Sequence, residues 1–303
     1  MTSPQRELLA DDGHSIKIYD WCAGISTPSA VIQVVHGLGE HAARYERFAN
    51  TCNNNDLIVV AHNHRGHGAS EGYGHFADAN GWDKVIADVL QVREDITDRY
   101  PNLPVVLLGH SMGSFVAQSF VMRHGGNYVA LILSASTLAS RVELAIGHAV
   151  AGIAAAIFGK RRTSELLNYL WIGKLNNGFR PCRTALDWLS RDADEVDRYI
   201  ADPFCGGLYS NRLWYDLAGG LLEITSSNSI ASVRTDLPIL IMGGEYDPVG
   251  GRIGLARLAD AYRKSGHDNL RLNVYPGGRH EMLNETNRDE VTADIISWVQ
   301  FQL

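Results

Sequence analysis

The sequence predicts an α/β protein, in which a mostly parallel central sheet is flanked by helices and interrupted by a helical insertion. Short β-branched runs alternate with longer segments of helical periodicity, a pattern typical of strands joined by crossover helices. The inner runs are continuously apolar, as expected for strands buried on both faces of a sheet. The alternation stops between Thr137 and Val233, where helical patterns follow one another without a convincing strand.

The predicted strands are short runs rich in Val, Ile and Leu, residues that pack well on a pleated surface. The alternating segment 15–21 comes first and suits an antiparallel edge strand. The runs that we expect to form the parallel part of the sheet are 30–35, 57–61, 105–108, 129–134, 238–242 and 270–275.

Apolar residues recur at helical spacing in the segments that join these runs. Four such segments are expected to be helices and to cover the sheet. They are residues 83–100, 114–124, 253–265 and 290–301.

The insertion divides the chain into two parts. Residues 1–136 and 234–303 form the predicted sheet domain, and residues 137–233 form the predicted helical cap. A connection this long carries structure of its own and is usually functional, so we expect a lid over the site. Its helical patterns are residues 144–158, 163–171 and 184–199.

Composition and charge narrow the class of protein. The 303 residues are 45% hydrophobic and 20% charged, as in ordinary globular proteins, and the net charge is −7. A net negative chain without a basic run does not attract nucleic acid, so we expect no nucleic-acid partner.

Cysteine usage and the apolar segments indicate a cytoplasmic protein. Cys22, Cys52, Cys182 and Cys205 lie far apart, form no zinc-site spacing, and are expected to be free and mostly buried. Residues 1–12 contain no apolar leader. The longest apolar stretch, 144–158, is shorter than the ~20 residues that a membrane-spanning helix needs.

Gly109-His110-Ser111-Met112-Gly113 fits the G-x-S-x-G pattern of a nucleophilic serine. The match follows the apolar run 105–108 directly and opens the helical pattern 114–124, which is the strand–turn–helix setting that the pattern requires. The glycines allow a sharp turn where only hydrogens fit against strand and helix. The alternative is an ordinary strand–helix turn in which Ser111 caps the helix.

A serine hydroxyl needs a base to remove its proton. His280 follows the run 270–275, and Asp247 follows the run 238–242. Reactive groups of a parallel sheet gather at the carboxyl ends of the strands, so we expect both residues beside Ser111. The order Ser, Asp, His is that of α/β-hydrolases, and Asp247 would orient His280. The alternatives are a surface histidine and a turn-forming aspartate.

The oxyanion of an acyl-transfer intermediate needs preorganised N–H donors. We expect one donor at the backbone of Met112, directly after the nucleophile. The second is expected at the backbone of Leu38, because Gly37 and Gly39 let that loop turn toward Ser111. His36 is expected to support the loop.

His62, His64 and His67 have the H-x-H-x-x-H spacing of some dinuclear zinc hydrolases. Those enzymes place aspartate before the third histidine, whereas this chain has Gly66. We therefore prefer a structural interpretation, a tight turn at Gly66 and Gly68, and predict that neither a metal nor another cofactor takes part in catalysis.

Three segments resemble monoacylglycerol lipases and related lysophospholipases of the α/β-hydrolase family. These are the oxyanion segment from His36 to His41 with Arg44-Tyr45, the turn from Asn63 to Ser70, and the nucleophile motif. The segments Gly244 to Val249 and Gly278 to Glu281 are similar to that family's acid and base loops. The resemblance covers the sheet domain and not the cap, and Asn63 replaces the family's usual aspartate.

The resemblance implies the triad Ser111, Asp247 and His280, with Leu38 and Met112 as oxyanion donors, and a lipid ester with one acyl chain as substrate. The apolar segment 144–158, followed by Lys160-Arg161-Arg162, would then line an acyl pocket, make transient contact with a membrane surface, or be a buried cap helix.

Other functions use the same triad, because a fold does not fix a reaction. An aminopeptidase would need an acidic subsite for the substrate's amine, and Glu165, Asp192 and Glu195 of the cap are candidates. Thioesterases and carbon–carbon hydrolases also remain open. A ligand-binding receptor that kept a hydrolase shell is a more remote alternative.

Overall fold

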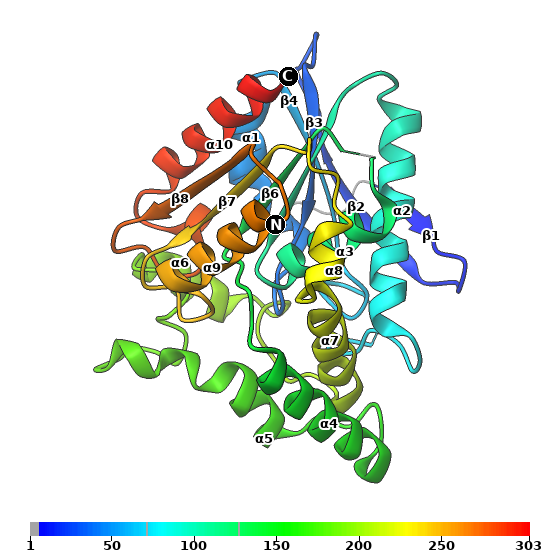
Figure 1. Cartoon of the computed structure of the whole chain (residues 1–303), viewed down its shortest axis with the longest axis vertical. Helices are drawn as coiled ribbons and strands as arrows, with labels where there is room; N and C mark the ends of the chain where they lie inside the picture. The colour runs from blue at the N-terminus through cyan, green and yellow to red at the C-terminus, as the bar shows by residue number, and fades with distance from the viewer. Residues whose placement is uncertain (1–5, 71, 127) are drawn as a thin grey trace.

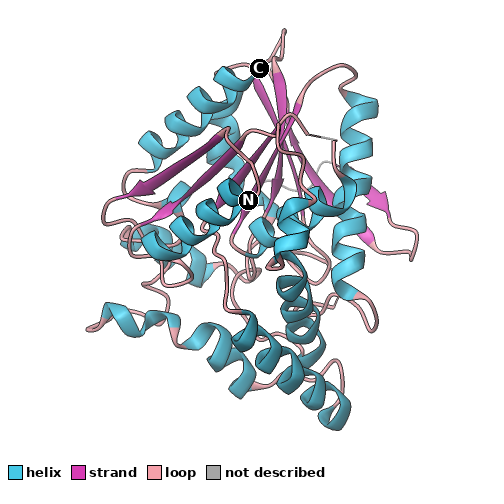
Figure 2. Ribbon diagram, in the orientation of Figure 1, coloured by secondary structure: helices cyan, strands magenta, loops and turns pink. Residues whose placement is uncertain are grey.

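The central feature of the computed structural model is an eight-stranded sheet (Figures 1 and 2). The structure describes residues 6–70, 72–126 and 128–303. The strand order is β1-β2-β4-β3-β5-β6-β7-β8, and only β1 and β2 run antiparallel to their neighbours. The strands are β1 (Arg6–Leu9), β2 (Ser15–Trp21), β3 (Ala30–Val35), β4 (Leu57–His62), β5 (Val105–His110), β6 (Ala130–Ser134), β7 (Ile239–Gly244) and β8 (Leu270–Tyr275).

These strands confirm the predicted α/β class and the antiparallel position of residues 15–21. Several strand boundaries differ by one or two residues, and one strand was missed. β5 continues two residues beyond the predicted run, into the glycine and histidine that precede Ser111, and β7 continues through Gly244. β1 was not predicted, because its four residues alternate between half-buried and exposed positions at the edge of the sheet.

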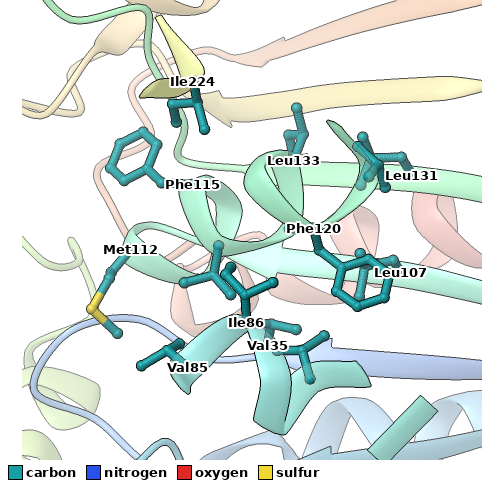
Figure 3. Close-up of a cluster of buried hydrophobic side chains, with 14 of the residues drawn as sticks. Val35, Val85, Ile86, Leu107, Met112, Phe115, Phe120, Leu131, Leu133 and Ile224 are labelled. Atoms are coloured by element: carbon teal, nitrogen blue, oxygen red, sulfur yellow. The ribbon is translucent and has the colours of Figure 1, made fainter. Parts of the chain in front are cut away.

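Helices cover both faces of the sheet and bury two separate hydrophobic clusters. Residues of α2, α3 and α9 belong to the cluster on one face, and residues of α1 and α10 to the cluster on the other. Figure 3 shows part of the first cluster, where Phe120 of α3 lies near Leu107 and Leu131 of the strands and Phe115 of α3 lies near Ile224. The helices are α1 (Glu46–Asn53), α2 (Gly81–Arg99), α3 (Met112–His124), α9 (Gly251–Lys264) and α10 (Arg288–Gln302).

Between β6 and β7 the described residues form helices and turns and no strand, only an isolated bridge between Thr163 and Ser210. These helices are α4 (Arg141–Phe158), α5 (Glu165–Asn168), the π-helical turn Tyr169–Gly173, α6 (Ala193–Ala201), α7 (Asn211–Ile224) and α8 (Ser227–Ala231). In Figure 1, α4 and α5 lie below the sheet, whereas α8 lies beside α3 and α7 lies between α8 and α4. Short 3-10 helices occur at Ala42–Tyr45, Leu175–Phe179 and Met282–Asn284.

The long helix α7 joins the insertion to the sheet domain, because it contacts α4 as well as α2 and α3. It was not among the predicted helices, and Gly219 and Gly220 in its centre explain why. A Cβ at Gly220 would overlap the ring of Trp82, so glycine lets α7 approach α2 closely. The predicted cap boundaries at 137 and 233 stay a prediction.

By length and composition alone, α4 is apolar enough to cross a membrane, and only 11% of its 18 residues is buried. It begins three residues before the predicted apolar stretch. The length of the apolar stretch therefore does not by itself exclude a membrane-spanning helix. All four cysteines are free, as predicted, with Cys52 buried and the other three half-buried. The N-terminal segment predicted to lack an apolar leader lies partly outside the described residues.

Candidate active site

Ser111 sits at a sharp turn between β5 and α3. Its backbone has φ 52° and ψ −120°, a conformation that costs energy for a residue with a side chain. A Cβ at Gly109 would overlap the Gly113 carbonyl, and a Cβ at Gly113 would overlap the Val35 carbonyl of β3. The steric reason predicted for both glycines is confirmed, and the turn presents Ser111 at the end of its strand.

The structure brings Ser111, His280 and Asp247 into one chain of hydrogen bonds. His280 Nε2 lies 2.9 Å from Ser111 Oγ, and His280 Nδ1 lies 2.8 Å from Asp247 Oδ1. Asp247 follows the carboxyl end of β7, and His280 follows that of β8. Three loops at one edge of the sheet therefore meet, as the strand-end argument predicted.

The imidazole of His280 is buried, at 3% exposure, between aromatic rings. The Trp188 ring centroid lies 4.8 Å away and that of His110 lies 5.0 Å away. Burial opposes a charged imidazole, but the charge and hydrogen bond of Asp247 and the nearby carboxylate of Glu281 outweigh it, so the pKa of His280 is raised. This environment favours a histidine that accepts a proton from Ser111.

Leu38 and Met112 both line the pocket into which Ser111 opens. Met112 is the first residue of α3, so its N–H is one of those left without a partner inside the helix. Gly37, next to Leu38, packs so tightly that a Cβ there would lie 3.2 Å from the Cβ of Ser111. The two segments expected to supply oxyanion donors thus meet at Ser111.

A buried ionic network holds the Leu38 segment to the His280 loop. Arg44 donates one hydrogen bond of 2.9 Å to Glu40 and two of 2.7 Å to Glu281. Glu40 in turn accepts hydrogen bonds from the Gly37 N–H and the Tyr45 hydroxyl. Burial alone would raise the pKa of Glu281, but Arg44 lowers it to about 2.

Sequence reasoning gave this network no role, although a signal was present. Glu40 and Arg44 lie inside the segment that carries the resemblance, and Glu281 follows His280 directly. Arg44 and Glu281 lie 237 positions apart in the chain, so spacing alone could not reveal their contact. Trp188 gave no signal in the sequence at all.

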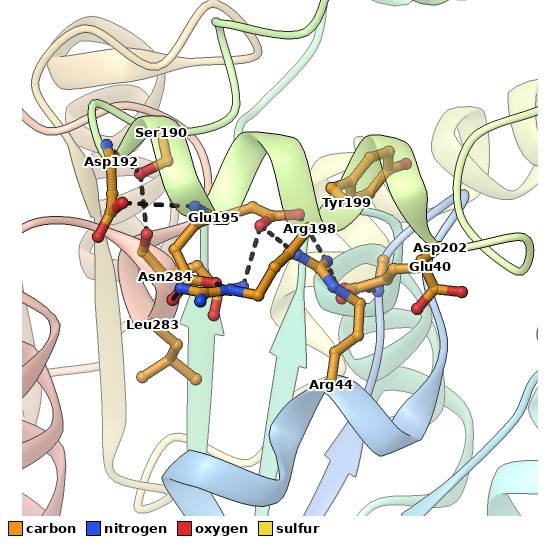
Figure 4. A network of polar contacts seen from close by, with 12 residues as sticks. Glu40, Arg44, Ser190, Asp192, Glu195, Arg198, Tyr199, Asp202, Leu283 and Asn284 are labelled. Carbon is orange, nitrogen blue, oxygen red and sulfur yellow. Dashed lines mark hydrogen bonds and ion pairs between the residues drawn. The ribbon is translucent and has the colours of Figure 1, made fainter. Parts of the chain in front are cut away.

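The insertion forms hydrogen bonds with the segment that contains Leu38. The Tyr199 hydroxyl of α6 and the Gly206 N–H both donate to the Gly39 carbonyl, at 2.6 Å and 2.8 Å. The Arg44 guanidinium stacks over the Tyr199 ring at 4.9 Å, and Figure 4 shows α6 lying across Arg44 and Glu40. The insertion therefore helps to fix the backbone beside Ser111.

Ser111 and His280 open into a pocket of about 940 Å³ between the sheet domain and the insertion. Its lining is mostly apolar. Side chains of α4, of the segment 167–175 and of α7 contribute to it, among them Leu144, Ile146, Val150, Leu167, Leu170, Trp171, Trp214 and Leu217. The segment 144–158 thus lines the pocket, and the alternative of a buried cap helix is wrong, because only Leu144 and Ala151 of α4 are buried.

The histidines after β4 form a buried cluster with His36. The rings of His36 and His64 are 4.3 Å apart, and those of His36 and His67 are 5.5 Å apart. His64 Nε2 contacts the His36 carbonyl, while the His64 N–H donates to His36 Nε2. Gly66 and Gly68 have positive φ, which confirms the predicted tight turn. These contacts support the loop that leads to Leu38.

The cap carboxylates considered for an amine subsite do not line this pocket. Asp192 accepts a hydrogen bond from Arg288 and caps α6, and Glu195 pairs with Arg47 and Arg198. The acidic residues that do line the pocket, within the described part of the chain, are Glu40, Glu143 and Glu281.

Comparison with known proteins agrees with this geometry. Residues 26–287 match the family model described as serine aminopeptidase, S33. The chain is 31% identical to the human protein named monoglyceride lipase, over 96% of this chain and 89% of that one. It is 29% identical to the monoacylglycerol lipase of Mycolicibacterium smegmatis, over 93% and 92%.

Among solved structures, a carboxyl esterase from Bacillus coagulans superposes with a TM-score of 0.91 at 27% identity, covering 99% of this chain and 98% of that one. Sheet order, the turn at Ser111 and the sequence matches all point the same way. The chain belongs to the family described as serine aminopeptidase, S33, and has the α/β-hydrolase fold.

Proposed function

We propose that the protein hydrolyses carboxylic esters of single-chain lipids, with monoacylglycerols as the substrate class. The observation that carries this proposal is the hydrogen-bonded chain of Ser111, His280 and Asp247 at the mouth of a large apolar pocket. Relatives named as monoacylglycerol lipases, matched over nearly the whole chain, support the same class.

In the proposed reaction, Ser111 Oγ attacks the ester carbonyl while its proton passes to His280 Nε2. The backbone N–H groups of Leu38 and Met112 stabilise the negative oxygen of the intermediate. When the intermediate collapses, the alcohol leaves with the proton from His280, and the acyl group stays on Ser111. Water then attacks the acyl group while its proton passes to His280. The fatty acid is released and Ser111 regains its proton from His280. Asp247 orients His280 throughout through the hydrogen bond to Nδ1.

The pocket explains a preference for one long acyl chain. Each methylene moved from water into an apolar site contributes ~0.8 kcal/mol, so chain length should raise kcat/KM while the pocket is being filled. The walls formed by α4 and α7 enclose the space above Ser111, and a second acyl chain would have to stay outside or displace α4.

Ester hydrolysis is favoured over aminopeptidase activity by the charges in the pocket. An aminopeptidase needs a carboxylate free to pair with the substrate's amine. Glu40 and Glu281 both pair with Arg44, and Glu143 lies on an exposed position of α4. No acidic residue that lines the pocket, within the described part of the chain, is therefore both buried and without a cationic partner.

The exposed face of α4 suits contact with a lipid surface. Val142, Ile146, Ile153 and Ile157 are each about 60–70% exposed, and Phe158 ends the helix at 66%. We propose that α4 lies in the membrane interface rather than across the bilayer, because it packs along α7 and a span would break that contact. A cytoplasmic enzyme fits four free cysteines, which suit a reducing compartment.

Steady-state kinetics on purified protein test the proposal. p-Nitrophenyl esters from acetate to octanoate, a monoacylglycerol, triolein and aminoacyl-anilides form the panel. We expect kcat/KM to rise with chain length, the monoacylglycerol to be cleaved well and triolein poorly. Faster cleavage of aminoacyl-anilides, or a preference for acetate, would contradict the lipid assignment. Exhaustive dialysis against EDTA should leave the activity intact.

A further inference from the structure

Three potential metal ligands gather where the insertion meets the oxyanion segment. They are His41, just after the segment that contains Leu38, and Asp202 and Cys205, in the turn after α6. One donor atom from each of the three lies within 4.8 Å of the other two. His41 Nε2 and Asp202 Oδ2 are 2.9 Å apart, and all three groups are sheltered from solvent.

Both segments that carry these ligands are held in place by other bonds. The Cys205 N–H donates to the Asp202 carbonyl at 3.1 Å, which closes the turn. The second carboxylate oxygen of Asp202 accepts the Phe204 N–H at 2.9 Å, so Oδ2 is directed to His41. The next residue, Gly206, bonds the Gly39 carbonyl and ties the turn to the oxyanion segment. The two backbone segments that carry the ligands are therefore fixed relative to each other.

The surrounding charges do not oppose a cation. Arg44 is near Asp202 and Cys205, but its charge is more than balanced by Glu40 and Glu281, which it pairs with. Burial raises the pKa of the Cys205 thiol, while Arg44 lowers it and the nearby carboxylates raise it further. A bound cation would replace the thiol proton, so affinity should increase with pH.

The geometry points to a binding site for a borderline-soft divalent cation of the Zn²⁺ class, formed by His41 Nε2, the Asp202 carboxylate and the Cys205 sulfur. Imidazole, carboxylate and thiolate are the ligands that Zn²⁺ prefers, and three protein ligands leave a fourth tetrahedral position for water. On binding, the thiol proton passes to solvent, and the imidazole of His41 binds through Nε2 with its N–H on Nδ1, which replaces its hydrogen bond to Asp202. The site lies outside the triad, and the cation would cross-link the insertion to the oxyanion segment.

Cobalt titration of the full chain tests this site, because a thiolate ligand gives Co²⁺ a near-ultraviolet charge-transfer band and tetrahedral coordination gives intense visible bands. Wild-type protein should develop both bands, and Zn²⁺ should remove them at about one equivalent. Cys205→Ser should lose the charge-transfer band and bind Zn²⁺ at least about tenfold more weakly. Cys182→Ser, which changes the other half-buried cysteine of the insertion, should behave like wild type.

Thermal unfolding gives a second measurement and checks that the variants fold. Zn²⁺ that binds the native state raises the Tm of wild-type protein by mass action, and the increase should be absent in Cys205→Ser and in Asp202→Asn. Both variants should unfold cooperatively in EDTA. A wild-type protein without the charge-transfer band, or a band that persists in Cys205→Ser, would overturn the proposal.

Discussion

The two halves of the insertion are held by different forces. The exposed half (141–173), which contains α4 and α5, presents apolar side chains to solvent, and its contacts with the rest of the chain are mainly those of α4 with α7. The anchored half (188–209), which contains α6, is bound to the sheet domain through polar groups (Figure 4). One connection between two strands thus contains both an exposed apolar surface and a part that is fixed by polar contacts.

The anchored half contacts both loops that flank Ser111. The Glu281 N–H donates to the Leu189 carbonyl at 2.8 Å, which joins this half to the loop of His280. Arg47 of α1 pairs with Glu195 of α6 and also bonds the Leu283 carbonyl and the Asn284 side chain. In the described residues, the exposed half has one ion pair with the sheet domain, between Arg161 and Asp78, and both side chains are exposed. We therefore expect a displacement of α4 to disturb the triad less than a displacement of α6.

The largest expected effect is a loss of stability in mild acid, because the anchored half bonds a loop that rests on buried histidines. Burial lowers the pKa of His62 and His67 from 6.5 to about 4, and it also lowers that of His36 and His64. The unfolded chain therefore takes up protons first. The stabilisation is fully present above pH 6.5 and is lost as the pH falls toward 4, at roughly 3 kcal/mol for each of His62 and His67.

Urea denaturation between pH 8 and pH 5 measures this loss. The free energy of unfolding should be flat at high pH and should fall steeply below about 6.5. A flat profile down to pH 5 would mean that the histidine cluster is protonated or rearranged without cost. It would also mean that the contacts of the anchored half do not depend on the charge of the histidine cluster.

Removing Arg44 should have the next largest effect, because it leaves Glu40 and Glu281 as buried, unpaired carboxylates. We expect Arg44→Met to lose about 3–5 kcal/mol in the free energy of unfolding and to lower kcat on soluble esters as well. Arg198→Met is the matched control, since Arg198 is mostly exposed and its partner Glu195 keeps the ion pair with Arg47, and it should lose less than ~1 kcal/mol. Equal losses in both variants would show that the network is not what anchors this half.

Polar substitutions in the exposed half should have the smallest effect on stability. Ile153→Ser with Ile157→Ser should change the free energy of unfolding by no more than ~0.5 kcal/mol per site, because both side chains are mostly exposed and neither lines the pocket. Hydrolysis of a monoacylglycerol in vesicles should fall at least about tenfold, because the loss of two isoleucines removes more than the ~1.4 kcal/mol of transfer energy that corresponds to a factor of ten.

The rate on a soluble short-chain ester should stay unchanged in this double variant. Phe301→Ser is the control, since Phe301 is an equally exposed apolar residue at the end of α10, far from α4 in sequence. It should leave both rates unchanged. If the vesicle and soluble rates fell together, α4 would act on the pocket and not on the lipid surface.

Features encoded by nearby residues could be predicted from the sequence, and features that depend on distant residues could not. The strands and the turn at Ser111 could be predicted from local patterns, because β-branched runs favour strands and the two glycines around the serine favour a sharp turn. Asp247 and His280 could be placed because parallel strands end at one edge. α1 could not be placed, since Glu46–Asn53 is rich in residues of weak helix propensity.

The anchored half was missed for a different reason. The predicted helix at 184–199 is in fact α6 at Ala193–Ala201, preceded by a loop in which Trp188 reaches His280. Its ion pairs join residues far apart in the chain, such as Arg47 and Glu195, 148 positions apart. No local period encodes such a contact. The exposed half, whose apolar pattern is local, was recognised at 144–158.

In the proposed mechanism, Ser111 is the residue that carries the acyl group. A fluorophosphonate reacts with a serine only where a base and an oxyanion site activate it. Mass spectrometry of the folded protein should find one adduct, on Ser111, and Ser111→Ala should show none and lose on the order of 10³-fold or more in kcat. An adduct on another residue, or Ser111→Ala with near wild-type turnover, would contradict the account.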